Sequence, residues 1–142
     1  PDGSLLARRV FLANNAFVRG LGVGAARVAA MYTYAGLTAP LEPAELARLG
    51  SEPRWGLLPA HRLGSTLRRT ADGRLMVRSF YGYEREADNR VIAGRLRDCL
   101  ARRFPELALT RSSAPFEYAW GGTTGLTYNG APLWGEVRRG LY

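Results

Sequence analysis

The segment that most constrains the fold runs from Ser65 to Tyr81, STLRRTADGRLMVRSFY. Two runs with the composition of β-strands flank Ala71-Asp72-Gly73, where glycine permits the positive φ that a tight turn requires. This pattern predicts a β-hairpin. Because the two strands of a hairpin are antiparallel neighbours, the sheet that contains them should be mainly antiparallel.

The remaining segments alternate between strand-like and helix-like patterns. Four runs of apolar, β-branched or aromatic residues predict further strands: 9–13, 28–34, 115–120 and 136–142. A short helix is expected at 42–49, where Pro43 occupies a first-turn position. A longer helix is expected at 87–104, because apolar residues recur there at three- and four-residue steps until Pro105 stops the pattern. This order predicts an α+β fold with a mainly antiparallel sheet flanked by helices.

Composition limits the partners. The 142 residues carry a net charge of +8, and all 20 basic residues are arginine. Alanine is equally abundant and the arginines are dispersed, which indicates a GC-rich coding sequence rather than a nucleic-acid surface, so no nucleic-acid partner is expected. No run reaches the roughly 18 apolar residues of a membrane span, so no membrane partner is expected either. The single cysteine, Cys99, suits a reducing cytoplasm.

The two ends predict a piece of a longer protein. The chain starts at Pro1 without an initiator methionine and stops at Tyr142, inside the last expected strand. We therefore expect that part of the functional machinery lies elsewhere in the polypeptide.

Four candidate sites are weaker than their structural alternatives. Residues 20–25 match G-x-G-x-x-A, but a strand rather than a helix is expected to follow, so a flexible connection is favoured over a dinucleotide-binding loop. His61 is the only histidine and has no recognisable nucleophile beside it. Cys99 falls on the apolar stripe of the long helix. Glu84 and Glu86 follow the hairpin as adjacent solvated acids rather than as a pair facing across a cleft.

One segment has unusual chemistry. Residues 119–135, AWGGTTGLTYNGAPLWG, hold five glycines, two tryptophans and three threonines, with no carboxylate, histidine, lysine or cysteine. Nothing in it can serve as an acid, a base or a good metal ligand. A surface loop of turn residues is one interpretation, and a set of bends that brings main chain close to a flat ligand is the other.

This segment resembles the C-terminal signature of the D-amino-acid oxidase superfamily of FAD-dependent amine and amino-acid oxidoreductases. In that superfamily W-x-G ends a strand and is followed by Thr-x-(Asp/Asn)-Gly-x-Pro and a further glycine. The matching positions are Trp120, Gly122, Thr127, Asn129, Gly130, Pro132 and Gly135. Four other segments resemble family motifs in the expected order: 10–17, 32–41, 73–78 and 103–107. Within the superfamily, these segments resemble the gamma-glutamylputrescine oxidoreductase-like branch.

The resemblance implies a two-domain flavoprotein. Residues 1–16 would end a strand and crossover of the FAD-binding domain, and residues 17–142 would belong to the substrate-binding domain. The intact protein would bind FAD next to Ala13, Asn14, Trp120, Gly121, Gly122, Thr123 and Pro132. Substrate would contact Tyr34, Thr38, Arg68 and Thr124. Asn15 stands where the family usually has glycine. No catalytic side chain and no metal site is implied, and the isolated chain should be colourless and inactive.

The implied chemistry is oxidation of a C–N bond by hydride transfer to the flavin, with a small-molecule amine as substrate and the remaining FAD domain as partner. Amino-acid-oxidising members often have an arginine at the position of Thr124, where it binds the substrate carboxylate. A threonine hydrogen bond is weaker than a charge-assisted one, which favours an amine or a substrate with a remote carboxylate unless Arg62, Arg68 or Arg78 substitutes. A stand-alone basic module that binds nucleic acid or an acidic partner, or a structural interaction domain, is the alternative.

Overall fold

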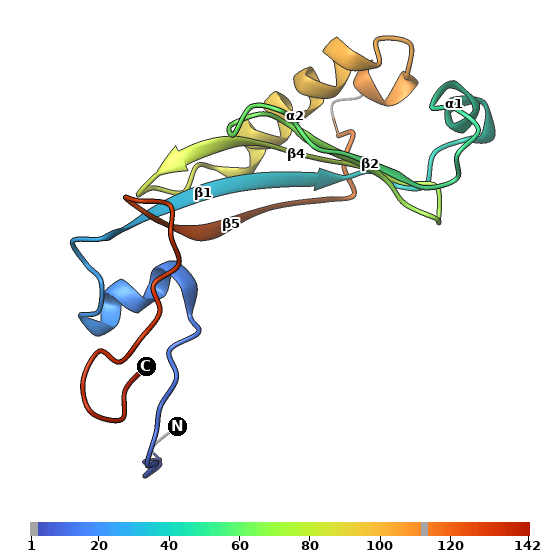
Figure 1. Cartoon of the computed structure of the whole chain (residues 1–142). Helices are drawn as coiled ribbons and strands as arrows, with labels where there is room; N and C mark the ends of the chain where they lie inside the picture. The colour runs from blue at the N-terminus through green and yellow to red at the C-terminus, as the bar shows by residue number, and fades with distance from the viewer. Residues whose placement is uncertain (1–2, 112–113) are drawn as a thin grey trace. The chain divides into compact units, whose positions relative to one another are not determined.

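The structure is a computed structural model that describes residues 3–111 and 114–142 (Figure 1). The chain divides into two compact units. Pro1–Met31 and Thr123–Tyr142 make up the first, called here the terminal unit, and Tyr32–Gly122 make up the second, called the central unit.

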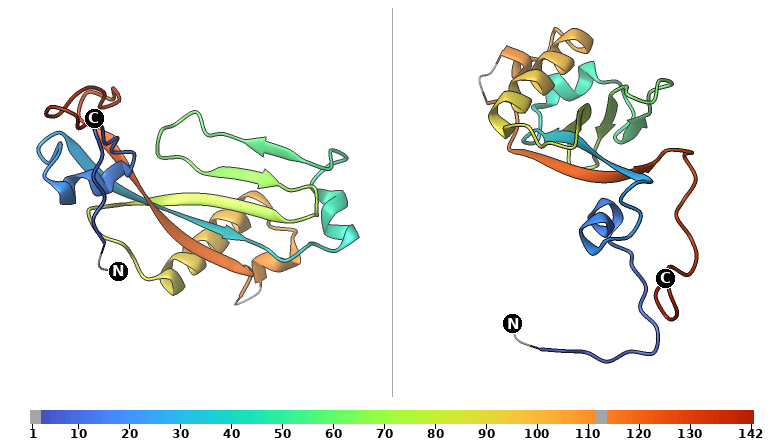
Figure 2. Two further views of the ribbon diagram at one scale, coloured as in Figure 1. Left: turned by 90° about the horizontal axis from the view of Figure 1, so that it is seen from below. Right: turned by 90° about the vertical axis from the view of Figure 1, so that its left-hand side faces the viewer.

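The strands form one five-stranded sheet in the order β2-β3-β4-β1-β5 (Figure 2). They are β1 (Val28–Leu37), β2 (Trp55–Leu57), β3 (Thr66–Arg69), β4 (Leu75–Tyr83) and β5 (Tyr118–Thr127). β2, β3 and β4 pair antiparallel. Beyond the end of β1, the N–H of Thr38 donates to Leu75 O and that of Leu41 to Gly73 O, so β1 and β4 also run in opposite directions. The α+β fold with a mainly antiparallel sheet is confirmed.

The hairpin is confirmed together with its turn. Thr66 lies opposite Arg78, and Arg69 opposite Leu75. Gly73 has φ +78°, the left-handed conformation for which glycine was expected in the turn. The register places residues an even number of positions apart on the same face, which determines the side-chain neighbours described below.

Both expected α-helices are present. α1 (Pro43–Arg48) has its proline in the first turn, and α2 (Asn89–Arg103) ends at Phe104, just before Pro105. The Asp88 carboxylate caps α2 by accepting the N–H of Arg90 at 2.7 Å. Two short 3₁₀ helices complete the described elements: η1 (Asn15–Leu21) and η2 (Ala108–Arg111).

The core of the central unit lies between α2 and one face of the sheet (Figures 1 and 2). Leu75 and Val77 from β4 are fully buried, as are Leu96 and Leu100 from α2. Burial of a leucine-sized side chain contributes about 1.5–3 kcal/mol, so this contact fixes which face of the sheet is covered.

Two predicted strands at the ends of the chain are wrong. Residues 9–13 and 136–142 make only isolated bridges, Val10 with Leu141 and Arg138 with Leu141. The N–H of Val10 donates to Gly140 O at 2.8 Å and that of Tyr142 to Val10 O at 2.9 Å. Phe11 is 65% exposed, so the apolar run is not a buried strand. A short apolar run becomes a buried strand only when neighbouring strands pair with it along its length and other elements cover it, and isolated bridges do neither.

The glycine-rich segment is also different from the expectation. β5 continues through Gly121, Gly122 and Gly125 to Thr127, so these glycines lie in an edge strand and not in bends. Pairing with β1 compensates for the weak strand propensity of glycine. The bend begins only after Thr127, where Gly130 has φ +71°.

Acid should destabilise the central unit partly through Glu117. The hydrogen bond from Arg74, at 2.5 Å, is the main cause that holds the pKa of Glu117 below its ordinary value, and Tyr118 adds to it. A depressed folded-state pKa gives stability that is present above the unfolded pKa of about 4.3 and is lost as pH falls through the folded value. We expect Glu117→Gln to flatten the fall in melting temperature between about pH 5 and pH 2. The matched control Glu52→Gln should retain the wild-type slope, and an unchanged slope in Glu117→Gln would contradict the prediction.

Candidate functional site

The predicted site residues fall in both units. The terminal unit holds Ala13, Asn14, Thr123, Thr124 and Pro132. The central unit holds Tyr34, Thr38, Arg68, Trp120, Gly121 and Gly122. The two groups therefore form two local environments with different chemistry.

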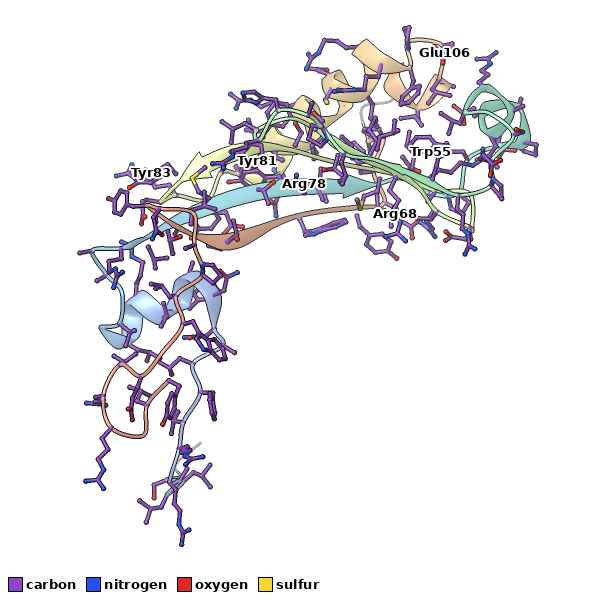
Figure 3. The ribbon with its side chains drawn as sticks, in the orientation of Figure 1. Trp55, Arg68, Arg78, Tyr81, Tyr83 and Glu106 are labelled. Atoms are coloured by element: carbon purple, nitrogen blue, oxygen red, sulfur yellow. The ribbon has the colours of Figure 1, made fainter. Side chains whose placement is uncertain are left out.

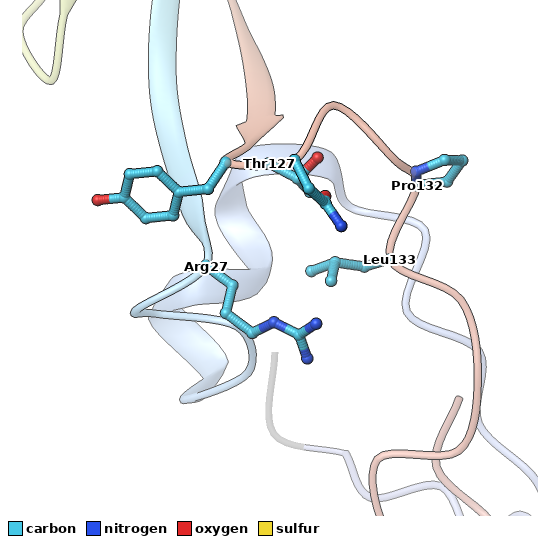
Figure 4. Close-up of a pocket in the computed structure, with 6 residues that line it drawn as sticks. Arg27, Thr127, Pro132 and Leu133 are labelled. Carbon is cyan, nitrogen blue, oxygen red and sulfur yellow. The ribbon is translucent and has the colours of Figure 1, made fainter.

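The terminal unit contains a cavity of about 1120 Å³. Ala13 and Pro132 line it, together with the aromatic rings of Phe11 and Trp134. A smaller hollow of about 240 Å³ adjoins Arg27, Thr127, Pro132 and Leu133 (Figure 4). Ligand sites are typically about 300–1000 Å³ and mostly apolar with a few polar groups. The larger cavity is slightly above this range, and its lining is mainly apolar and aromatic.

Two neighbouring asparagines in the terminal unit have different roles. Asn15 fixes β5, because its side chain accepts the N–H of Gly125 at 2.6 Å and donates to Thr123 O at 3.3 Å. Asn14 precedes η1 without capping it, and its Oδ1 is buried with no hydrogen-bond partner among the described residues. A buried acceptor without a partner is costly, and Asn14 itself is not among the residues that line the cavity.

Gly121 and Gly122 have opposite surroundings. A Cβ at Gly121 would meet the ring of Tyr34 at 3.1 Å and Glu86 Oε1 at 2.8 Å, so the close approach at this glycine is to the protein's own tyrosine. A Cβ at Gly122 would meet nothing within 4 Å. Gly121 therefore allows β5 to pack closely against Tyr34, whereas Gly122 leaves open space on the other face of the strand.

Two of the predicted substrate residues are in the core. Tyr34 and Thr38 are each only 1% exposed. The hydroxyl of Tyr34 accepts the N–H of Ala87 at 2.6 Å, and Thr38 Oγ1 accepts the N–H of Leu75 at 3.0 Å. In this structure both hydroxyls hold backbone in place instead of facing a ligand.

The sheet face opposite α2 is the surface of the central unit best suited to bind a ligand, and we call it the open face. Alternation along β4 and β3 directs Leu75, Val77 and Leu67 into the core and directs Arg78 and Arg68 to the other side. No described helix of the central unit lies on that side (Figures 1 and 2). Trp120, next to Gly121 on β5, is 43% exposed.

Sequence reasoning mentioned Arg78 only as a substitute, and the structure makes it the best-positioned cation of the open face (Figure 3). Its guanidinium donates to Thr33 Oγ1 at 3.3 Å and to Thr66 Oγ1 at 3.1 Å. It also lies 5.6 Å from the centre of the Tyr81 ring, within cation–π range. The hairpin register, which pairs Thr66 with Arg78, was the signal that could have identified it.

The other candidate sites have structural roles. His61 Nδ1 accepts the N–H of Leu63 at 3.2 Å, and Cys99 is buried beside Ser65. Residues 20–25 join η1 to β1, so the G-x-G-x-x-A match is not followed by a helix. Among residues 3–111 and 114–142, no group of three or more histidine, cysteine, aspartate or glutamate side chains is arranged to hold a metal ion.

Comparison with known proteins identifies the family. The model of the family described as FAD dependent oxidoreductase matches residues 2–142, nearly the whole chain. The chain belongs to the FAD-dependent oxidoreductase family. No curated protein and no solved structure matches it. No helix among the described residues is long and apolar enough to cross a membrane.

The two adjacent glycines give a direct test of their different surroundings. We expect Gly121→Ala to lower the free energy of unfolding by roughly 1–3 kcal/mol, because the added methyl group must displace the Tyr34 ring or Glu86. Gly122→Ala adds the same methyl group into open space and should change stability by less than about 0.5 kcal/mol. Urea unfolding of both variants measures the difference. Equal destabilisation would show that the close approach at Gly121 is not real.

Proposed function

We propose that the intact protein is an FAD-dependent oxidoreductase that oxidises a C–N bond of an amine or amino-acid-like substrate. Family membership over residues 2–142 is the observation that carries this proposal. In the same proposal, residues 1–16 end the FAD-binding domain, residues 17–142 belong to the substrate-binding domain, and the protein belongs to a gamma-glutamylputrescine oxidoreductase-like branch.

The residues of the terminal unit fit a flavin ring. The large cavity combines aromatic walls at Phe11 and Trp134 with main chain at Gly125 and Gly130. Asn14, whose Oδ1 has no hydrogen-bond partner among the described residues, is adjacent in sequence to the lining residues Ala13 and Asn15, and an isoalloxazine carries an N–H that such an acceptor can bind. Ala13, Asn14, Thr123 and Pro132 are accordingly the residues of this unit that we propose to hold FAD, and Trp120, Gly121 and Gly122 are proposed from the family resemblance.

The proposed chemistry does not require an acid or a base from the protein. When bound, FAD supplies hydride acceptance, and the protein supplies binding, orientation and exclusion of water. On the open face, the Trp120 ring on β5 offers an apolar wall and Arg68 on β3 a cation, while Gly122 on β5 leaves open space. These residues would orient the substrate without exchanging a proton with it. The buried hydroxyls of Tyr34 and Thr38 would support that face from behind.

Thr124 is proposed to select against plain α-amino acids. It lies on β5, at the position where amino-acid-oxidising relatives often have the carboxylate-binding arginine. A neutral hydroxyl gives about 1 kcal/mol of net hydrogen-bond energy, against roughly twice that for a charged donor. The preferred substrate is therefore an amine, or an amine whose carboxylate is remote from the oxidised carbon.

The protein produced from its complete gene should purify with the visible absorbance of oxidised flavin. Addition of a primary or secondary amine under anaerobic conditions should bleach that absorbance, because the hydride removed from the carbon next to nitrogen reduces the ring. The chain of residues 1–142 alone is the matched control and should stay colourless. A full-length protein without flavin would refute the proposed function.

A second test concerns Thr124. In the full-length protein, Thr124→Arg should raise kcat/KM for α-amino acids by about fivefold, because a charge-assisted hydrogen bond to the α-carboxylate replaces a neutral one and adds about 1 kcal/mol. Thr124→Val, which removes only the hydroxyl, should not raise it. If Thr124→Arg leaves α-amino-acid turnover unchanged, then Thr124 does not determine this specificity.

A further inference from the structure

We infer that Arg78 is the anchor for a substrate carboxylate, and that the open face around it is an anion-binding site. The inference rests on the proposed function and names the chemical class of its substrate: amines that carry a carboxylate at a distance from the oxidised C–N bond.

The first argument is charge. The five strands contain three arginines, Arg68, Arg69 and Arg78, and not one aspartate or glutamate. Arg69 points to the other face, where it is buried and donates to Gly50 O at 2.8 Å. Strand residues therefore give the open face two positive charges and no negative one. A surface of a single sign attracts ligands of the opposite sign.

The second argument is that Arg78 is already held in place. The hydroxyls of Thr33 on β1 and Thr66 on β3 each accept one hydrogen bond from it, and the Tyr81 ring lies beside it on β4. All these partners are neutral, and the described residues place no carboxylate within ion-pair distance of Arg78. A guanidinium has five N–H donors, so three remain for a ligand. Because its side chain is fixed before binding, less conformational entropy is lost when an anion binds.

The third argument is position. Thr66 lies directly opposite Arg78, and Arg68 is two residues further along the same face of β3. Arg68 is thus a diagonal neighbour of Arg78, about 7–8 Å away in backbone position. Trp120 offers an apolar surface on the same face, on β5. A small molecule with an apolar body and a terminal carboxylate matches this combination of groups, and its planar carboxylate suits the fork of an arginine.

The test uses the full-length protein and two probes that differ in one charge, 4-aminobutyrate and its neutral amide 4-aminobutanamide. Calorimetry should show that the wild type binds the carboxylate at least about tenfold more tightly than the amide. Arg78→Met should remove this preference, leaving the two affinities within about threefold. Arg78→Lys, which keeps the charge but loses the fork, should give an intermediate ratio and is the readout if Arg78→Met does not fold.

The matched control is Arg95→Met, which removes the same charge from an exposed position on α2. It should keep the wild-type preference, because its charge lies on the helix rather than on the open face. Equal affinity of the wild type for both probes would overturn the inference, as would a preference that persists in Arg78→Met and Arg78→Lys.

Amine-dependent bleaching of flavin, measured on the same preparations, tests the proposed function separately. Bleaching without a carboxylate preference overturns only the role of Arg78, whereas a preference without bleaching overturns the proposed chemistry.

Discussion

The packing of α2 against one face of the sheet is the interaction on which the central unit depends. Leu96 and Leu100 reach the sheet from one stripe of the helix, and Leu75 and Val77 meet them from alternate positions of β4. Because side chains of a strand alternate between the two faces, the residues that lie between core positions must point away from α2. These residues form the open face.

This division explains why consecutive arginines of β3 differ in role. Arg69 faces the core side and donates to the carbonyls of Leu46 and Gly50, where it ties α1 to the sheet. Arg68 faces the open side and is exposed. Arg74, in the turn of the hairpin, is again structural: it donates to Thr38 O at 2.9 Å and pairs with Glu117. Arg68 and Arg78, which hold no neighbouring element in this way, both lie on the open face.

Sequence patterns predicted correctly those elements that interactions between residues close in sequence determine. The hairpin and α2 were correct because a glycine turn, a helical repeat and a following proline act within a few residues. The two terminal strands failed because a strand needs a partner, and the sequence does not say which segment it will meet. The glycine segment was misjudged for the same reason: pairing with β1 makes Gly121 and Gly122 part of a strand. Tyr34 and Thr38 were expected to contact substrate only because of the family resemblance. A sequence motif does not show that their side chains are buried.

Arg78 shows why site residues are harder to predict than elements. Its three neighbours come from β1, β3 and β4. Thr66 and Tyr81 belong to the hairpin itself, but Thr33 is 45 residues away in sequence and reaches Arg78 only because β1 lies beside β4 in the sheet. A half-buried cation that is held by neutral groups has lost part of its hydration without gaining a counter-ion. An arriving carboxylate would supply that counter-ion, so its binding would be favoured by the same strand geometry that fixes the arginine. Orientation of this kind is what a protein contributes when a cofactor performs the reaction, and it needs no acid or base beside it.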